Sequence, residues 1–244
     1  MSAATVDVAW GATGARDLAT TTDVLVIVDV LSFSTSLSIA VDRGAEVWPY
    51  TLGSDGAEQL AREIGAVLAR GRSTRQGRTL SPASLVDIEP GTRLVLPSPN
   101  GSAIAHAALS GGLPVVVACL RNAAAAAALL GDFDRVGIVA CGERWPDGTL
   151  RPAYEDWLGS GVVSSALISA GASATPDAAA AAAAASSPRP LSDCPSGREL
   201  IERGFAGDVV LAEERDVSRV VPQLLAGRFS ATPSDPVPIA RSGL

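Results

Sequence analysis

One stretch constrains the fold more than any other: an apolar segment at residues 24–30, followed at once by a polar turn and a second apolar run. The first segment is apolar except for Asp29. This pattern predicts a strand buried on both faces, as in a parallel sheet covered by helices. Asp29 lies at the carboxyl end of that strand. The run after Ser36 has helical spacing, and Ser34, Thr35 or Ser36 is expected to cap the helix.

The turn after Asp29 predicts a binding site. In open α/β sheets, ligands bind outside the carboxyl ends of the strands, and a helix N-terminus there attracts anions. A carboxylate beside an anion site is explained if a cation lies between them. We therefore expect a metal ion and a phosphate group at this turn. The alternative is that Asp29 only caps the turn, and this stretch alone leaves both interpretations open.

Apolar strands and helical segments alternate along the rest of the chain, with short turns between them. This order predicts an α/β fold with a mostly parallel sheet flanked by helices, layered α/β/α. We expect residues 1–230 to form a single domain, which could divide into two lobes, and residues 231–244 to form a loose tail. Residues 11–22 are expected to be a loop and residues 208–212 the last strand. Thr175, Pro176 and Asp177 predict a helix start.

Composition excludes several classes of function. The net charge is −7 and no cluster of Lys and Arg forms a stripe, which argues against nucleic-acid binding. Three cysteines without framework spacing, and an N-terminus unlike a signal peptide, favour a reducing cytoplasm. The Ala- and Ser-rich residues 161–187 contain Pro176 and Asp177 and make a poor membrane span. An apolar, Ala-rich surface makes a homodimer plausible.

Three further polar clusters follow predicted strands, and all could meet Asp29 in one crevice. Asn100, Gly101 and Ser102 can present an amide and backbone N–H groups at a helix start, although Asn-Gly turns are common without any function. Arg121 and Asn122 follow the next strand. The third cluster consists of the carboxylates Glu143, Glu155 and Asp156. They could complement a helix dipole. With Asp29 they could instead offer the oxygen ligands that Mg²⁺ prefers.

Other catalytic patterns are absent or weak. The sequence has no GxxxxGK[ST] phosphate loop and no GxGxxG fingerprint. His106 is the single histidine and lies in an Ala-rich segment, which disfavours a Ser-His-Asp triad. Cys141 could be a nucleophile, but a small core cysteine at a strand end is the more ordinary interpretation. The basic loop GRSTRQGR at residues 71–78 is either a solvated loop or an anion-binding loop.

Taken in series, these motifs resemble the 2-phosphosulfolactate phosphatase family. The resemblance covers residues 23–222 and rests on five motifs in order: VIVDVLSFSTSLSIAV with GAEVWP soon after, SPNGSAIA, ACLRNAAA, VACGERWPDGTLRPAYEDWLGSG, and SGRELIERGFAGDVVLAEERDVSRVVP. It implies an α/β, Mg²⁺-dependent acid phosphatase that converts 2-phospho-3-sulfolactate to 3-sulfolactate and phosphate, a step toward coenzyme M. Three details depart from the family pattern. Ser32 stands where the family usually has Arg, Ser98-Pro99 replaces Thr-Thr, and residues 77–84 are shorter than the usual Gly-rich loop.

Our hypothesis from residues and resemblance together is a Mg²⁺-dependent phosphomonoesterase acting on a small phosphorylated 2-hydroxy acid. Asp29 and Glu143 are the expected catalytic residues, and Asp29, Glu155 and Asp156 the expected metal ligands. The expected substrate-binding residues, with Arg72 or Arg121 facing a second acid group of the substrate, are Ser34, Thr35, Arg72, Asn100, Gly101, Ser102, Arg121 and Asn122. The competing hypothesis is a non-catalytic anion-binding protein that retained the fold.

Overall fold

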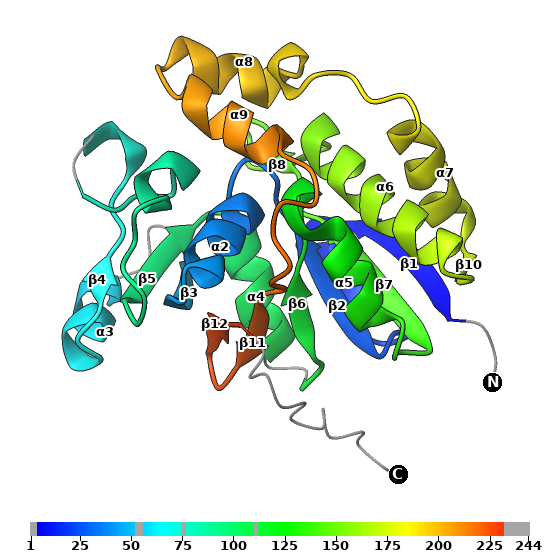
Figure 1. Ribbon diagram of the computed structural model, residues 1–244, viewed down its shortest axis with the longest axis horizontal. Helices are drawn as coiled ribbons and strands as arrows, with labels where there is room; N and C mark the ends of the chain where they lie inside the picture. The colour runs from blue at the N-terminus through cyan, green and yellow to red at the C-terminus, as the bar shows by residue number, and fades with distance from the viewer. Residues whose placement is uncertain (1–3, 52–55, 75–76, 110–111, 232–244) are drawn as a thin grey trace.

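A computed structural model describes residues 4–51, 56–74, 77–109 and 112–231. Within these residues, ten strands join one sheet in the order β10-β1-β7-β2-β6-β11-β12-β3-β5-β4 (Figure 1). The strands of this sheet are β1 Thr5–Trp10, β2 Val24–Val28, β3 Glu46–Thr51, β4 Val67–Leu68, β5 Arg93–Ser98, β6 Val115–Val117, β7 Arg135–Ala140, β10 Ser173–Ala174, β11 Gln223–Leu225 and β12 Arg228–Ser230. A separate small hairpin pairs β8 Glu143–Arg144 with β9 Leu150–Arg151.

Helices cover both faces of the sheet (Figure 1). The α-helices are α1 Gly11–Leu18, α2 Phe33–Asp42, α3 Ala57–Glu63, α4 Gly101–Leu109, α5 Ala123–Leu130, α6 Tyr154–Ser169, α7 Pro176–Ala185, α8 Pro195–Glu202 and α9 Ala206–Glu213. Short 3₁₀ turns are η1 Arg72–Thr74, η2 Pro82–Leu85, η3 Leu120–Asn122 and η4 Leu191–Asp193. This arrangement confirms the predicted α/β fold with a mostly parallel sheet between helices.

The central strand β2 explains why the sheet needs both layers. All five of its residues are buried, and it pairs in parallel with β6 on one side and β7 on the other. Alternate side chains enter different cores. Val24, Val26 and Val28 belong to the core that includes residues of α5, α6 and α7, whereas Leu25 and Ile27 belong to the core that includes residues of α2 and α4. The near-continuous apolar run of the sequence is the consequence of burial on both faces.

Two predicted elements were wrong. Residues 11–18 form helix α1 rather than a loop, because Ala15 and Leu18 reach the core although Gly and Thr are poor helix formers. Residues 208–212 lie in helix α9 rather than in a final strand. Val209 and Ala212 are buried while Val210 is 63% exposed, which is a helical spacing that a short apolar run does not reveal.

Three other details complete the comparison with the sequence. The helix start at Thr175 is confirmed, since its side chain accepts a hydrogen bond from the amide of Ala178. Residues 232–244 of the expected tail lie outside the described residues. No helix in the described part of the chain has the length and apolarity needed to cross a membrane.

The topology brings several strand ends to one edge of the sheet. Strands β2, β5 and β7 run parallel to their neighbours and end at Val28, Ser98 and Ala140. Each is followed by a polar turn. In Figure 1, α8 and α9 lie across this edge of the molecule, above α2 and beside α6. Segments far apart in sequence therefore surround the turn that follows Asp29.

Candidate functional site

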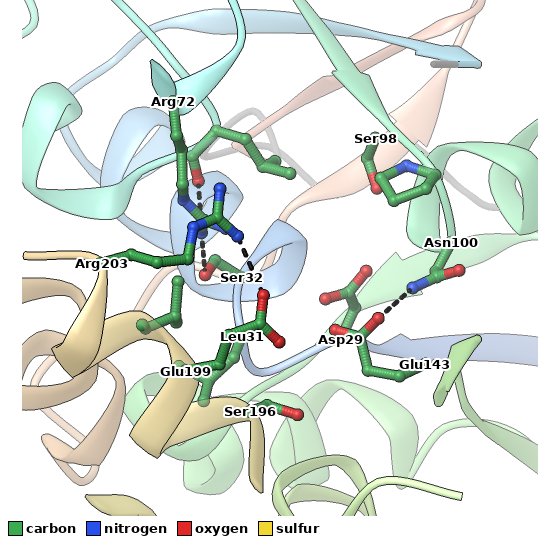
Figure 2. Close-up of a pocket in the computed structure, with 13 residues that line it drawn as sticks. Asp29, Leu31, Ser32, Arg72, Ser98, Asn100, Glu143, Ser196, Glu199 and Arg203 are labelled. Atoms are coloured by element: carbon green, nitrogen blue, oxygen red, sulfur yellow. Dashed lines mark hydrogen bonds and ion pairs between the residues drawn. The ribbon is translucent and has the colours of Figure 1, made fainter. Parts of the chain in front are cut away.

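Asp29 lies directly after β2, between the first turns of two helices (Figure 2). Its side chain is 7% exposed. Oδ1 accepts a hydrogen bond from the amide of Phe33 at 3.1 Å, and Oδ2 accepts one from the amide of Gly101 at 3.1 Å. These amides belong to the N-termini of α2 and α4, where the free N–H groups favour negative charge. The sequence placed this carboxylate correctly at a strand end beside a helix start.

The hydroxyl groups of Ser34 and Thr35 turn inward, and neither residue lines the pocket. Ser34 Oγ accepts from the Asp29 amide at 2.8 Å and donates to the Ile27 carbonyl at 3.2 Å. Thr35 Oγ1 donates to the Val30 carbonyl at 2.7 Å. Helix α2 begins at Phe33, and its N-cap residue Ser32 makes no side-chain capping bond, so the expected cap by a later hydroxyl was wrong. Ser34 and Thr35 instead brace the turn that presents Asp29.

A pocket of about 190 Å³ opens beside Asp29 (Figure 2). This volume suits a small metabolite, because pockets for drug-sized ligands are usually about 300 Å³ or more. Carboxylates of Asp29 and Glu143 lie at one end, and the guanidinium groups of Arg72 and Arg203 lie at the other, where Arg203 pairs with Glu199 at 2.9 Å. The lining residues are Asp29, Leu31, Ser32, Arg72, Leu80, Ser98, Pro99, Asn100, Glu143, Ser196, Glu199, Leu200 and Arg203.

Glu143 reaches the pocket from β8, and Asn100 reaches it from the turn before α4. Asn100 Nδ2 donates to Glu143 Oε2 at 3.4 Å. Burial and the neighbouring charges of Asp29 and Glu155 raise the pKa of Glu143 to about 7, against the weaker opposing effects of Arg151 and Asn100. A carboxyl group with a pKa near neutrality can exchange a proton with a bound molecule at physiological pH.

Asp29 differs from Glu143 in its environment. Burial raises the pKa of Asp29 to about 6, while the amides of Phe33 and Gly101 and the charge of Arg72 act in the opposite direction. Two backbone amides and the charge of Arg72 favour the ionised form of Asp29, whereas Asn100 and the charge of Arg151 are the groups that favour the ionised form of Glu143. Two neighbouring carboxyl groups whose environments separate their pKa values can take different roles in one reaction.

The other two carboxylates of the cluster lie behind the pocket. Both oxygens of Asp156 accept backbone hydrogen bonds at 2.7 Å, from Val30 and from Gly142, which ties the turns after β2 and β7 together. Glu155 is 1% exposed, and its Oε2 has no hydrogen-bond partner among the described residues. The charge of Glu155 nevertheless raises the pKa of both Asp29 and Glu143.

The donor set fits Mg²⁺ in chemistry, although the described residues contain no group of three or more His, Cys, Asp or Glu side chains placed to hold a metal ion. Mg²⁺ usually takes one or two carboxylates and completes its shell with water and substrate oxygens. Asp29 retains free lone pairs on oxygens that each accept one amide. Glu155 Oε2 is another hard oxygen without a hydrogen-bond partner among the described residues, but Glu155 is not among the residues that line the pocket. Asp156 is committed to the backbone.

Of the basic loop, Arg72 is the residue that reaches the pocket. Its Nη2 donates to the hydroxyl of Ser32 and, at 3.3 Å, to the carbonyl of Leu80. A guanidinium group thus reaches position 32, where the resemblance leads us to expect an arginine. Arg78 turns away and pairs with Asp87, and residue 75 lies outside the described part of the chain.

Four other predicted binding residues stabilise the surroundings of the pocket without lining it. The Gly101 amide holds Asp29, and Ser102 Oγ donates to the Leu96 carbonyl at 3.2 Å. Arg121 pairs with Glu214 and donates to the Leu211 carbonyl at 3.1 Å. Asn122 accepts from the Cys119 amide at 2.9 Å and donates to the carbonyls of Val117 and Val220. The structure thus separates Arg121 and Asn122 from the candidate site.

Helix α8 supplies a wall of the pocket that the sequence analysis missed. Ser196, Glu199, Leu200 and Arg203 all line it. These positions are spaced by three or four residues, which places them on one face of a helix. That spacing was readable in SGRELIER, but nothing in the sequence showed that this helix would lie over the end of β2.

Comparison with known proteins agrees with this arrangement. The family model described as 2-phosphosulpholactate phosphatase matches residues 14–227. A "probable 2-phosphosulfolactate phosphatase" of Deinococcus radiodurans is 28% identical over 220 residues, covering 84% of this chain and 89% of that protein. The matched range contains every residue that lines the pocket. The chain belongs to the 2-phosphosulpholactate phosphatase family.

Proposed function

We propose that this protein is a Mg²⁺-dependent phosphoric monoester hydrolase that acts on a small phosphorylated 2-hydroxy acid. The substrate suggested by resemblance is 2-phospho-3-sulfolactate, which would yield 3-sulfolactate and phosphate. The observation that carries the proposal is the arrangement of charged side chains in the pocket: Asp29 and Glu143 lie at one end, and Arg72 lies at the other with Arg203, which pairs with Glu199. Such a pocket can place a phosphate at the carboxylate end and a second acid group against the guanidinium groups.

In this reaction the residues in and behind the pocket take different roles. Asp29, with Glu155 behind it, would hold Mg²⁺, which supplies Lewis-acid neutralisation of the phosphate charge when bound. Asn100 orients Glu143 through their hydrogen bond. Glu143, in its ionised form, accepts a proton from the attacking water. The water oxygen bonds to phosphorus as the bond from phosphorus to the C2 oxygen breaks. That oxygen takes up a proton from solvent and leaves as the alcohol, and Glu143 releases the proton that it accepted to solvent. Arg72 would bind the non-reacting acid with the guanidinium donors that Asp208, Ser32 and Leu80 leave free.

Phosphate release from 2-phospho-3-sulfolactate tests the proposal. We expect activity with Mg²⁺, loss of activity in excess chelator, and recovery when Mg²⁺ is restored, because the pocket offers hard oxygen ligands. Glu143→Gln should lower kcat by about a hundredfold or more, on the scale of general-base catalysis. Full activity in chelator would contradict the metal assignment. Phosphate binding without turnover would favour the competing hypothesis of a non-catalytic anion-binding protein.

A further inference from the structure

Asp208 is a buried carboxylate outside the pocket that contacts a residue inside it. It lies in α9 and is 1% exposed. One oxygen, Oδ1, accepts hydrogen bonds from the Ser81 hydroxyl and, at 3.2 Å, from the Ala83 amide. The other, Oδ2, lies 3.4 Å from Arg72 Nε. Asp208 thus connects α9, the turn before η2, and a guanidinium group of the pocket.

Arg72 is held from several sides. Its side chain is 14% exposed. Nε forms an ion pair with Asp208 without a hydrogen bond, Nη2 donates to Ser32 and the Leu80 carbonyl, and the guanidinium carbon lies 5.8 Å from the centre of the Phe205 ring. A guanidinium group is planar, so contacts on two edges fix the direction of its remaining donors. Arg72 lines the pocket, so we expect an acid group bound there to meet those donors.

The charge balance at Arg72 depends on Asp208. Burial and the nearby positive charge of Arg203 lower the pKa of Arg72, and Asp208 is the strongest opposing influence, followed by Asp29 and Glu143. Asp29 and Glu143 lie at the far end of the pocket and are engaged there. Asp208 is therefore the carboxylate that compensates a largely buried cation placed beside a second cation.

We propose that Asp208 is a positioning residue that holds the Arg72 guanidinium at the pocket wall, so that affinity for the second acid group of the substrate depends on helix α9. The identity of that acid group rests on the proposed function. Among the described residues, the contacts of Asp208 include neither Asp29 nor Glu143, which lie at the reacting end of the pocket. Its effect should accordingly fall on substrate binding rather than on the chemical step.

A double-mutant cycle with Asp208→Asn and Arg72→Ala tests this role. Asparagine keeps an acceptor for Ser81 and Ala83 but removes the charge. We expect D208N to raise KM for 2-phospho-3-sulfolactate by about tenfold with kcat within about twofold, and to leave KM for p-nitrophenyl phosphate, which has no second acid, nearly unchanged. In the R72A background, D208N should add less than about a twofold effect, because the two residues act as one unit. Equal effects on both substrates, or independent effects of the two substitutions, would overturn the proposal.

Ser81→Ala is the matched control. It removes one contact of Asp208 to the turn and leaves the ion pair, so KM should change by less than about twofold. A rise in KM as large as that of D208N would show that the turn, not the charge, matters. If D208N does not fold, Arg72→Lys tests the same ion pair by changing its cation. Lysine keeps the positive charge but lacks the planar guanidinium group, which can contact Asp208 on one edge and the substrate on another. An unchanged KM in R72K would contradict the proposal.

Binding of 3-sulfolactate, measured by calorimetry, separates this inference from the proposed function. No turnover is involved in that measurement. We expect the same pattern there: weaker binding by D208N than by the unmodified protein, and no further weakening when R72A is already present. Failure of phosphate release with this pattern intact would reject the proposed reaction and keep the role of Asp208. Intact phosphate release, together with 3-sulfolactate binding that D208N does not change, would support the proposed reaction and reject the role of Asp208.

Discussion

At the scale of single residues, Asp29 shows how one side chain can be both supported and destabilised by its surroundings. Two helix N-termini donate amides to it, which favours the ionised form. Burial disfavours that form more strongly, so the pKa rises from 3.8 to about 6. Its folded-state pKa lies above its unfolded value. The contribution of this group to stability is therefore complete below pH 3.8 and is lost as the pH rises through about 6.

Asp29→Asn should change activity and stability in different ways. Activity should fall by about a hundredfold or more, because the charge at the reacting end of the pocket is lost. At pH 8 the substitution removes a buried charge, a gain of about 3 kcal/mol for a shift of about two pKa units. It also turns the side-chain NH₂ toward one backbone N–H, at a cost of about 1–3 kcal/mol. We expect these effects nearly to cancel at pH 8.

At about pH 3, below the unfolded-state pKa of 3.8, the unmodified carboxyl is protonated in both the folded and the unfolded state, so the variant keeps only the penalty. The melting temperature of D29N should then lie about 2–12 °C below that of the unmodified protein, given about 2–4 °C per kcal/mol for a chain of this size. Thermal unfolding at both pH values checks this difference. Asp17→Asn, at an exposed position of α1, is the control and should change neither quantity. A penalty that is the same at both pH values would mean that the Asp29 carboxyl does not titrate as described.

At the scale of elements, the site depends on how closely α2 and α4 approach each other. A Cβ on Gly101 would overlap the Phe33 ring, with ring atom Cγ 2.7 Å away. Phe33 is fully buried, so the ring has little room to move. The absence of a side chain at position 101 is therefore what allows the amide of α4 to reach Asp29. This is a packing requirement, and it differs from the conformational reason for which Asn-Gly turns are common.

Gly101→Ala should lower the melting temperature by about 2–12 °C, on the scale of overpacking a core at about 1–3 kcal/mol. It should also weaken activity, because the amide contact to Asp29 is displaced. Gly207→Ala is the matched control. It is a helical glycine in α9, where an added Cβ would have no neighbouring atom within 4 Å, and alanine there should be neutral or slightly stabilising. Equal melting temperatures for the two variants would contradict the packing argument.

The elements also show how far the sequence could be interpreted. The apolar run of β2 and the cap at Thr175 were predictable because local composition decides them. Helices α1 and α9 were not, since burial by distant partners outweighs weak local preferences. The same limit applies to the candidate site. Arg72 and Arg121 are alike as residues after a strand, yet one enters the pocket and the other pairs with Glu214.

At the scale of the whole molecule, the pocket joins distant parts of the chain. Its lining runs from Asp29 to Arg203, and four of its residues come from the segment that forms and follows α8. The sheet behind it is continuous across the described residues from β10 to β4. A ligand in this pocket therefore touches segments on both sides of the central strand, and its binding free energy should stabilise the sheet as a unit.

Thermal unfolding with Mg²⁺ and inorganic phosphate tests this coupling. We expect one cooperative transition without ligand, which would favour a single domain over two independent lobes. At about a hundred times the dissociation constant, binding to the folded state alone contributes about 2.7 kcal/mol, so the whole transition should shift upward by about 5–10 °C. Sodium chloride at equal ionic strength is the control for nonspecific salt effects, and D29N should lose most of the shift because it lacks the charge that would hold the metal. Two transitions, of which phosphate moves one, would instead show two lobes with the ligand bound to one of them.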